Sequence, residues 1–301
     1  MNNEVKILVL GKDGMLGSMV FHYLKDKGLD VVGTQIHDEK EEIYFKIDKG
    51  YDIPSLKAMV ARSRCDYVIN CIGCTRLSRN NMRSFKSNYY LNAILPQILQ
   101  EVCSDPSVKV IHMSTDAVFS GRTDAPYYED DTVDGEGDYA VSKIIGEVDA
   151  KSTLNVRCSI IGREMHSNCS LLNWFLTLRE NEKIDGYVNH IWNGVTTRQF
   201  AEFCFNLITA GLFEELISHT GVVNLAPNEP INKYNLLKLF NEIFDKKVEI
   251  TPVQAPHKIC RILKSRFLNN RLAKTSSGLK DEIIKMNDFF VSNIRKGGGD
   301  I

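Results

Sequence analysis

The most informative part of the chain reads Val5-Lys6-Ile7-Leu8-Val9-Leu10-Gly11-Lys12-Asp13-Gly14-Met15-Leu16-Gly17. Residues 5–10 are mostly apolar and predict a short buried strand. Residues 11–17 follow the pattern G-x-x-G-x-x-G and lead into a segment with helical spacing. Glycines in this context let backbone amides approach a pyrophosphate, which the positive end of the helix attracts. Residues 11–17 therefore predict a dinucleotide-binding turn.

Strands and helices alternate through the first half of the chain. Apolar, β-branched runs predict strands over residues 5–10, 29–34, 66–70, 108–113 and 154–161. Apolar residues at helical spacing predict helices over residues 18–27, 53–64, 89–103 and 140–150. A parallel sheet with helices on both faces accommodates this alternation. We therefore expect an α/β protein: a Rossmann-like doubly wound parallel sheet with a smaller C-terminal α/β substrate domain.

The second half is less regular. It predicts helices over residues 171–180, 197–210, 234–244 and 283–294, a strand over 221–225 and an extended segment over 248–252. We expect residues 1–155 to form the NAD(P)-binding domain and residues 156–301 to form mainly the substrate-binding domain. Residues 156–161 and 221–225 are expected to return to the main sheet.

Composition and charge exclude several classes of protein. The 301 residues include 37 Lys+Arg and 38 Asp+Glu, which give a formal net charge of −1. A protein that binds nucleic acid by neutralising phosphates is expected to be basic. A membrane-spanning helix needs about 20 apolar residues, and the apolar runs here are far shorter. The N-terminus also lacks the pattern of a signal peptide. We expect a cytoplasmic protein with no nucleic-acid or membrane partner.

The cysteines predict packing rather than metal binding. The chain has 8 of them, at irregular spacing and mostly in apolar surroundings. In a cytoplasmic protein we expect them to be reduced. Cys71-x-x-Cys74 lacks the second pair, or the histidines, that a zinc site requires. No metal site is predicted.

The end of the second predicted strand bears on the choice of dinucleotide. NAD sites often carry an acidic residue there to hold the ribose hydroxyls. This strand runs into Thr34-Gln35-Ile36-His37, with no acid before Asp38. The absence of an acid favours NADPH, with NADH as the alternative. Lys12 is a candidate cation for the 2′-phosphate, the alternative being a solvated loop lysine.

A second pattern suggests acid–base chemistry. Tyr139-Ala140-Val141-Ser142-Lys143 places Tyr139 and Lys143 four residues apart at the start of a predicted helix, and therefore on one face. An ammonium beside a phenol favours the phenolate and lowers the pKa of the tyrosine. Tyr139 can then exchange a proton with a substrate oxygen while hydride moves.

Together these patterns resemble the extended short-chain dehydrogenase/reductase family, and within it the dTDP-4-dehydrorhamnose reductase branch. The resemblance covers about the first 165 residues, in family order. The segments that carry it are Gly11 to Gly17, Asn70-Cys71-Ile72-Gly73, Ser114-Thr115-Asp116-Ala117-Val118-Phe119-Ser120-Gly121, Tyr139 to Lys143 with Gly146-Glu147, and Asn155 to Gly162. The segment that begins at Ser114 is the most specific of them.

The resemblance assigns roles to individual residues. It implies that Thr115 binds the substrate carbonyl, that Tyr139 is the general acid, and that Lys143 binds the nicotinamide ribose and tunes Tyr139. The remaining implied roles are contact with the adenine end for Asp48, cofactor-lining backbone for Asn70, Cys71, Ile72 and Gly73, support of the active site for Asn92, and contact with the sugar for Asp116.

The second half matches less well, so substrate residues are less defined. His166 lies in a segment expected to close over the substrate. Trp192 is a candidate to stack on a base or sugar, or alternatively to pack between domains. Arg261 is a candidate partner for a diphosphate, or alternatively for a surface ion pair. The chain also departs from its relatives at Ala117, where they carry an aromatic residue.

The predicted function is NAD(P)H-dependent reduction of a 4-keto group on a nucleotide-linked 6-deoxyhexose, with the nucleotide left open. One alternative is an epimerase–reductase that uses His166 and Cys169. It is disfavoured because Asp116 occupies the position of the family's epimerase cysteine. Another alternative is a cofactor-binding regulatory subunit without turnover, against which the intact Thr115, Tyr139 and Lys143 argue. A homodimer is expected from the resemblance alone.

Overall fold

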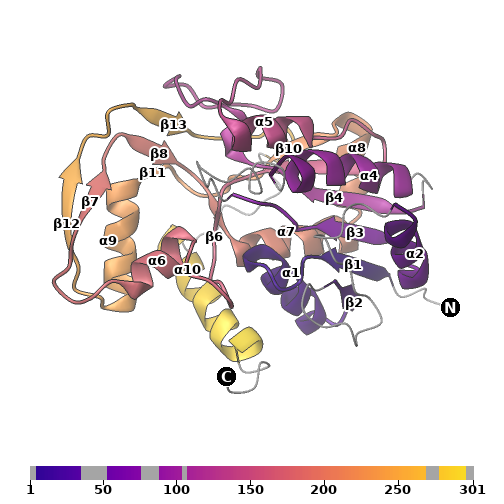
Figure 1. The fold of residues 1–301 in the computed structure, drawn as a ribbon, viewed down its shortest axis with the longest axis horizontal. Coiled ribbons are helices and arrows are strands. Elements are labelled where there is room, and N and C mark those ends of the chain that lie inside the picture. The colour runs from indigo at the N-terminus through magenta and orange to yellow at the C-terminus, as the bar shows by residue number, and fades with distance from the viewer. Residues whose placement is uncertain (1–4, 35–52, 76–87, 104–106, 269–277, 296–301) are drawn as a thin grey trace.

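A parallel six-stranded sheet forms the centre of the protein (Figure 1). The structure is a computed structural model that describes residues 5–34, 53–75, 88–103, 107–268 and 278–295. The sheet order is β10-β5-β4-β3-β1-β2, and all neighbouring strands are parallel. The strands are β1 (Lys6–Leu10), β2 (Asp30–Gly33), β3 (Tyr67–Asn70), β4 (Lys109–Met113), β5 (Thr153–Arg157) and β10 (Val222–Asn224).

The strands are apolar on both faces because helices cover both. Along β1, Ile7 and Val9 point into one apolar core, whereas Leu8 and Leu10 point into another. Both pairs are at most 1% exposed. A parallel sheet buried in this way requires continuous apolar strands, which explains why the sequence signal was strong here.

Two layers of helices sandwich the sheet. The layer on the side of Ile7 consists of α1 (Met15–Asp26), α7 (Thr197–Thr209), α8 (Leu212–His219), α10 (Gly278–Phe289) and the π-helix η4 (Phe290–Ile294). The opposite layer consists of α2 (Ile53–Ser63), the π-helix η2 (Tyr90–Ile94), α4 (Leu95–Val102) and α5 (Asp138–Ile145), with α5 packed on η2. No helix in the described part of the chain is both long and apolar enough to span a membrane.

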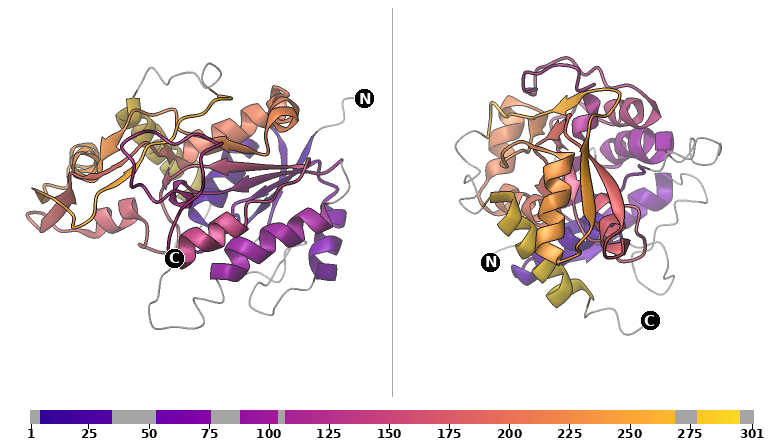
Figure 2. Two further views of the ribbon diagram at one scale, coloured as in Figure 1. Left: turned by 90° about the horizontal axis from the view of Figure 1, so that it is seen from above. Right: turned by 90° about the vertical axis from the view of Figure 1, so that its left-hand side faces the viewer.

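Small sheets lie beyond one end of the main sheet, as the left view of Figure 2 shows. One has the order β11-β8-β13, and the others pair β12 with β7 and β6 with β9. These strands are β6 (Ile160–Ile161), β7 (Lys183–Tyr187), β8 (His190–Trp192), β9 (Val195–Thr196), β11 (Ile231–Asn232), β12 (Glu249–Val253) and β13 (Ile259–Arg261). The helices α6 (Leu171–Thr177) and α9 (Lys233–Phe244) pack with them, and α9 contacts both β7 and β12.

The predicted Rossmann-like α/β fold is confirmed, but several element predictions were wrong. The strand expected over residues 154–161 is interrupted, because residues 160–161 form β6 and pair with β9. The helix expected over 140–150 starts at Asp138 and ends at Ile145. The strands β7, β8, β9, β11 and β13 and the helix α8 were missed. β7 is exposed at three of its five positions, so its sequence carries no apolar run.

Candidate active site

The glycine-rich turn follows β1 and begins α1. Gly11 has φ +80°, and the amide of Gly14 donates to the Gly11 carbonyl at 3.0 Å. A Cβ on Gly17 would lie 2.0 Å from the Gly11 carbonyl oxygen. The turn therefore requires glycine at positions 11 and 17, and this tight path brings the N-terminus of α1 to the rim of a cavity. Backbone amides at a helix N-terminus fit the pyrophosphate of a dinucleotide.

A cavity of about 580 Å³ opens at the carboxyl ends of the central strands. Its walls combine segments that are far apart in sequence. They are Gly14–Leu16 on α1, Cys71–Thr75 after β3, Ser114–Ala117 after β4 and Cys158–Ile160 after β5. Ligands of doubly wound sheets bind at this edge of the sheet. The predicted cofactor segments and the predicted catalytic residues therefore face one space.

Buried polar side chains fix the loop after β3. Asn70 is 0% exposed, and its Oδ1 accepts from the Ile72 amide at 3.1 Å. Its Nδ2 contacts Nδ1 of His112 on β4 at 3.0 Å. The amide can only donate in this contact, so Nδ1 accepts and the ring proton lies on Nε2. Cys71, Ile72 and Gly73 thereby line the cavity with a fixed backbone.

Asn92 joins this loop to the catalytic helix. Its Nδ2 donates to the Cys74 carbonyl at 2.8 Å and to Ser142 Oγ at 3.1 Å, and its Oδ1 accepts from the Cys74 amide at 2.9 Å. A Cβ on Gly146 would lie 1.8 Å from the Asn92 carbonyl oxygen. Glycine at 146 thus lets α5 approach η2 closely enough for the Asn92–Ser142 hydrogen bond.

Thr115 and Tyr139 meet at the wall of the cavity. Thr115 follows β4, and its Oγ1 accepts from the Ala117 amide at 3.2 Å and contacts Asp116 Oδ1 at 3.2 Å. Tyr139, on the first turn of α5, lines the same cavity, and the Thr115 hydroxyl is close enough to lower the pKa of the tyrosine. Burial raises the pKa of Tyr139 to about 12, against the lowering effect of Thr115. Tyr139 is therefore a protonated hydroxyl at neutral pH, as a proton donor must be.

Lys143 is anchored one turn further along α5. Its side chain is buried, and its Nζ donates to the Met113 carbonyl at 2.7 Å. Burial lowers the pKa of Lys143 to about 8, and the negative charge of Glu147 raises it. For Tyr139, burial has the largest effect on the pKa, and the positive charge of Arg261 lowers it. The expected tuning of Tyr139 by Lys143 stays a prediction.

Charged side chains gather around Asp116, the residue after Thr115. Burial raises the pKa of Asp116, whereas Arg261 and Lys233 oppose that shift. Arg261 lines the cavity at the end of β13, and its Nε donates to the Phe119 carbonyl at 2.8 Å. Lys233 begins α9 and lies with Nζ 4.7 Å from the centre of the Trp192 ring. Sequence reasoning missed Lys233 because it belongs to no local motif.

Other predicted site residues lie elsewhere. Trp192 is 5% exposed and belongs to the apolar core, where a Cβ on Gly194 would overlap its ring, so packing and not stacking on a ligand is its role. His166 is exposed and is not among the described residues that line the cavity. Lys12 lies beside Gly33 at the end of β2, outside the cavity wall. Asp48 lies outside the described residues.

Some cavity residues had no sequence signal. Glu164 and Ser170 line the cavity, and a Glu164 oxygen accepts from the amides of Cys169 and Ser170, at 2.8 Å each. This contact closes the loop that carries His166. In the ranges that the structure describes, no three His, Cys, Asp or Glu side chains are grouped so as to hold a metal ion.

The parallel sheet, the glycine turn and the Thr115–Tyr139–Lys143 arrangement define a Rossmann-type protein of the extended short-chain dehydrogenase/reductase class. Residues 5–282 match the family model described as RmlD substrate binding domain. The chain belongs to this family, and the predicted resemblance is confirmed.

Curated relatives support this assignment over part of their length. A probable low-salt glycan biosynthesis reductase from Haloferax volcanii is 33% identical over 46% of this chain and 46% of its own length. A dTDP-4-keto-6-deoxy-D-glucose reductase from Streptomyces niveus is 31% identical over 46% and 45%. A dTDP-4-dehydrorhamnose reductase from Mycobacterium tuberculosis is 28% identical over 47% and 44%. These matches span about half of each relative.

Solved structures extend the likeness in fold. A dTDP-4-dehydrorhamnose reductase from Clostridium acetobutylicum has a TM-score of 0.75 at 18% identity, over 95% of this chain and 100% of that one. One from Bacillus anthracis, in complex with NADP, has a TM-score of 0.75 at 18% identity, over 95% and 99%. The common fold therefore includes the second half of the chain, where the sequence match is weak.

Proposed function

We propose that this protein is an NADPH-dependent reductase that converts the 4-keto group of a nucleotide-linked 6-deoxyhexose to an alcohol. The observation that carries the proposal is one cavity lined by the start of α1, by Thr115 and by both Tyr139 and Lys143. Curated relatives named as reductases of dTDP-linked keto sugars support it. Residue roles and the choice of substrate are part of the same proposal.

The residues present fit a nicotinamide dinucleotide. The turn at residues 11–17 would hold its pyrophosphate, and Lys143 with the loop 70–73 would line its ribose and nicotinamide end. When bound, the reduced cofactor supplies the hydride.

Cations at the end of β2 support the choice of NADPH. The aliphatic part of the Lys12 side chain packs closely against Gly33. A Cβ added at Gly33 would lie only 2.8 Å from Lys12 Cδ. Lys12 and Lys25 place their Nζ atoms 5.4 Å and 4.7 Å from the centre of one ring, that of Phe21. An acidic residue at the end of this strand would hold ribose hydroxyls, whereas cations attract a 2′-phosphate.

The chain's own residues complete the reduction. Thr115 would hold the substrate oxygen by a hydrogen bond, and Tyr139 would donate its proton to that oxygen as negative charge develops there. A positioned general acid contributes roughly 10²- to 10⁴-fold to a rate. Lys143 would remain a cation beneath the site and stabilise the phenolate that forms. Asp116 and Arg261 line the cavity next to Thr115 and would contact the sugar nucleotide.

The alternatives fare differently. The epimerase–reductase alternative relied on His166, which is exposed and outside the described cavity wall, so the structure gives it no support. The regulatory alternative is opposed by the close arrangement of Thr115, Tyr139 and Lys143. The expected homodimer and the cytoplasmic location stay predictions from the sequence.

The test is NADPH oxidation by the purified protein with 4-keto-6-deoxyhexoses linked to dTDP, UDP and GDP, with NADH run in parallel. We expect turnover on one nucleotide series and a requirement for Tyr139, checked with Tyr139→Phe. Solvent deuterium at the carbons beside the keto group would show epimerase activity as well. Cofactor binding with no turnover on any sugar would overturn the proposal in favour of a binding protein.

A further inference from the structure

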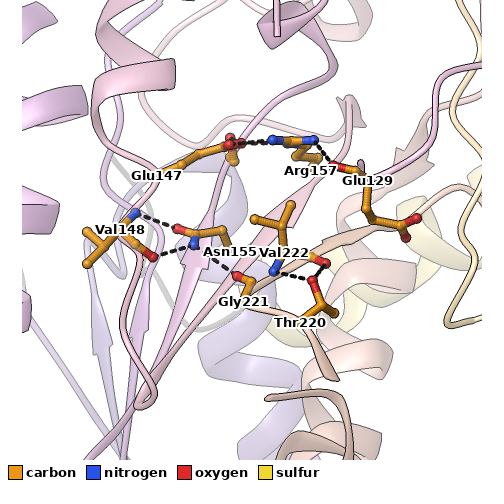
Figure 3. A network of polar contacts seen from close by, with 9 residues as sticks. Glu129, Glu147, Val148, Asn155, Arg157, Thr220, Gly221 and Val222 are labelled. Carbon is orange, nitrogen blue, oxygen red and sulfur yellow. Dashed lines mark hydrogen bonds and ion pairs between the residues drawn. The ribbon is translucent and has the colours of Figure 1, made fainter. Parts of the chain in front are cut away.

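The catalytic helix rests on buried polar groups. The side chains that α5 buries are Ala140, Ser142 and Lys143, of which two are polar. Beneath the helix and the turn that follows it lie Ser114, Asn155 and Arg157, each at most 5% exposed. Asn155 bonds the backbone of Val148 twice, by donating to its carbonyl at 2.8 Å and accepting from its amide at 3.2 Å (Figure 3). Directional hydrogen bonds therefore hold this segment.

Three adjacent residues at the end of β4 adjoin three groups of the site. The Met113 carbonyl accepts from Lys143 at 2.7 Å, and Thr115 lies at the cavity wall with Tyr139 and lowers the pKa of that tyrosine. Between them, Ser114 Oγ donates to Glu147 Oε1 at 2.6 Å. Glu147 is thus fixed to the same short segment as the proposed catalytic residues, although the proposed function assigns it no role.

A buried arginine holds the other side of Glu147. Arg157 on β5 donates from Nε to Oε1 at 2.8 Å and from Nη2 to Oε2 at 2.7 Å, and Figure 3 shows the two groups facing each other. Their side chains are only 6% and 10% exposed. The remaining guanidinium nitrogen, Nη1, donates to the Glu129 carbonyl at 3.1 Å. Paired, two-point hydrogen bonding of this kind fixes orientation as well as distance.

The charge of Glu147 acts directly on Lys143. The titratable groups that face the Lys143 ammonium in the described chain are Glu147, Cys158 after β5 and His112 on β4. Burial raises the pKa of the Cys158 thiol and lowers the pKa of His112, so both are neutral near pH 7. Glu147, the ion-pair partner of Arg157, is the neighbour whose charge raises the pKa of Lys143.

We propose that Glu147, held by Arg157 and Ser114, is a positioning residue that keeps Lys143 cationic and in place beneath Tyr139. The inference rests on the proposed function only in one respect, namely that a cationic Lys143 assists catalysis. Its physical content, the protonation of Lys143, can be measured without any sugar. Arg157 orients the carboxylate, and Ser114 ties it to the strand that carries Thr115.

The experiment is competitive labelling of lysines with trace acetic anhydride from pH 6 to 10, with Lys143 followed by mass spectrometry. In the wild-type protein we expect a midpoint near 8 for Lys143. In Glu147→Gln the midpoint should fall by about one pH unit, the effect of losing a nearby opposite charge. The alkaline limb of the NADPH-dependent rate should move to lower pH by the same amount. Asp149→Asn removes an exposed carboxylate two residues away and should change neither readout.

A second variant separates folding from charge. Glu147→Gln leaves Arg157 buried without its anion, so the double variant Glu147→Gln with Arg157→Met removes both charges and restores a neutral core. We expect this double variant to keep the lowered labelling midpoint at a melting temperature close to wild type. A wild-type midpoint in either folded variant would overturn the proposal. Labelling that shifts as expected in a protein that turns over no sugar would instead reject the proposed function.

Discussion

At the scale of single residues, the hydroxyl of Tyr139 is the group on which the proposed chemistry depends. Its pKa is raised to about 12 by burial, so it carries its proton throughout the neutral range. We expect Tyr139→Phe to lower kcat by about 10²- to 10⁴-fold, since a positioned general acid is lost. NADPH affinity, measured by quenching of protein fluorescence, should change little. A variant that retains more than a tenth of wild-type kcat would show that another group donates the proton.

Lys12 gives a second prediction for a single residue, the selectivity for the phosphorylated cofactor. Lys12→Met removes one of the cations near Phe21 while it keeps the stem that packs on Gly33. We expect the ratio of kcat/KM for NADPH to that for NADH to fall about tenfold, which corresponds to about 1.4 kcal/mol. Lys27→Met is the matched control, because Lys27 follows the last turn of α1 and lies over a different ring, that of Tyr23. An unchanged ratio in Lys12→Met would place the 2′-phosphate elsewhere.

At the scale of secondary-structure elements, the contact between α5 and η2 depends on Gly146. A Cβ at this position would lie 1.8 Å from the Asn92 carbonyl oxygen, and backbone cannot move aside cheaply. We expect Gly146→Ala to lower the free energy of unfolding by about 1–3 kcal/mol, the usual cost of overpacking. Activity should fall with it, because Asn92 and Ser142 separate. Gly221→Ala, where the nearest atom lies 3.9 Å from the added carbon, should be neutral in urea unfolding.

The accuracy of the sequence predictions also varies between elements. β1, β3 and β4 were predictable because each is buried on both faces and therefore mostly apolar. The shorter strands of the second half gave no such signal. β11 has two residues, both only half-buried, and it pairs with β8 through contacts far apart in sequence. Tertiary pairing, which sequence patterns do not report, decides the structure of such segments.

The residues of the site divide in the same way, into those that belong to a local sequence motif and those that only the fold brings together. Gly11, Tyr139 and Lys143 could be singled out because each belongs to a pattern with fixed spacing within one turn or one helix. Lys233 and Glu164 were missed because the fold, and no motif, brings them to the site. For Trp192 the sequence left two roles open, stacking on a ligand or packing, because the residues that bury its side chain lie elsewhere in the chain.

At the scale of the whole molecule, buried His112 makes stability depend on pH. Burial and the charge of Lys143 hold its folded-state pKa well below 6.5, so the unfolded chain binds a proton more readily. Uptake of a proton by His112 therefore favours the unfolded chain as the pH falls below about 6.5. The free energy of unfolding decreases by up to about 1.4 kcal/mol per pH unit.

Urea unfolding at pH 7.5 and pH 5.5 tests this dependence. We expect the wild-type protein to lose more stability between the two pH values than His112→Gln does. His219→Gln, which removes an exposed histidine, should behave as wild type. Equal losses in the wild-type protein and His112→Gln would show that other groups set the acid sensitivity.

The end of β4 is also a common point of attachment for groups of the proposed active site. Met113 and Ser114 form hydrogen bonds with Lys143 and Glu147, and Thr115 lines the cavity with Tyr139, so all three groups adjoin one short segment of the chain. A displacement of this strand end would carry Lys143 and Glu147 with it, because both are hydrogen-bonded to it. The opposite wall of the cavity can therefore change in sequence without altering the hydrogen bonds that hold Lys143 and Glu147.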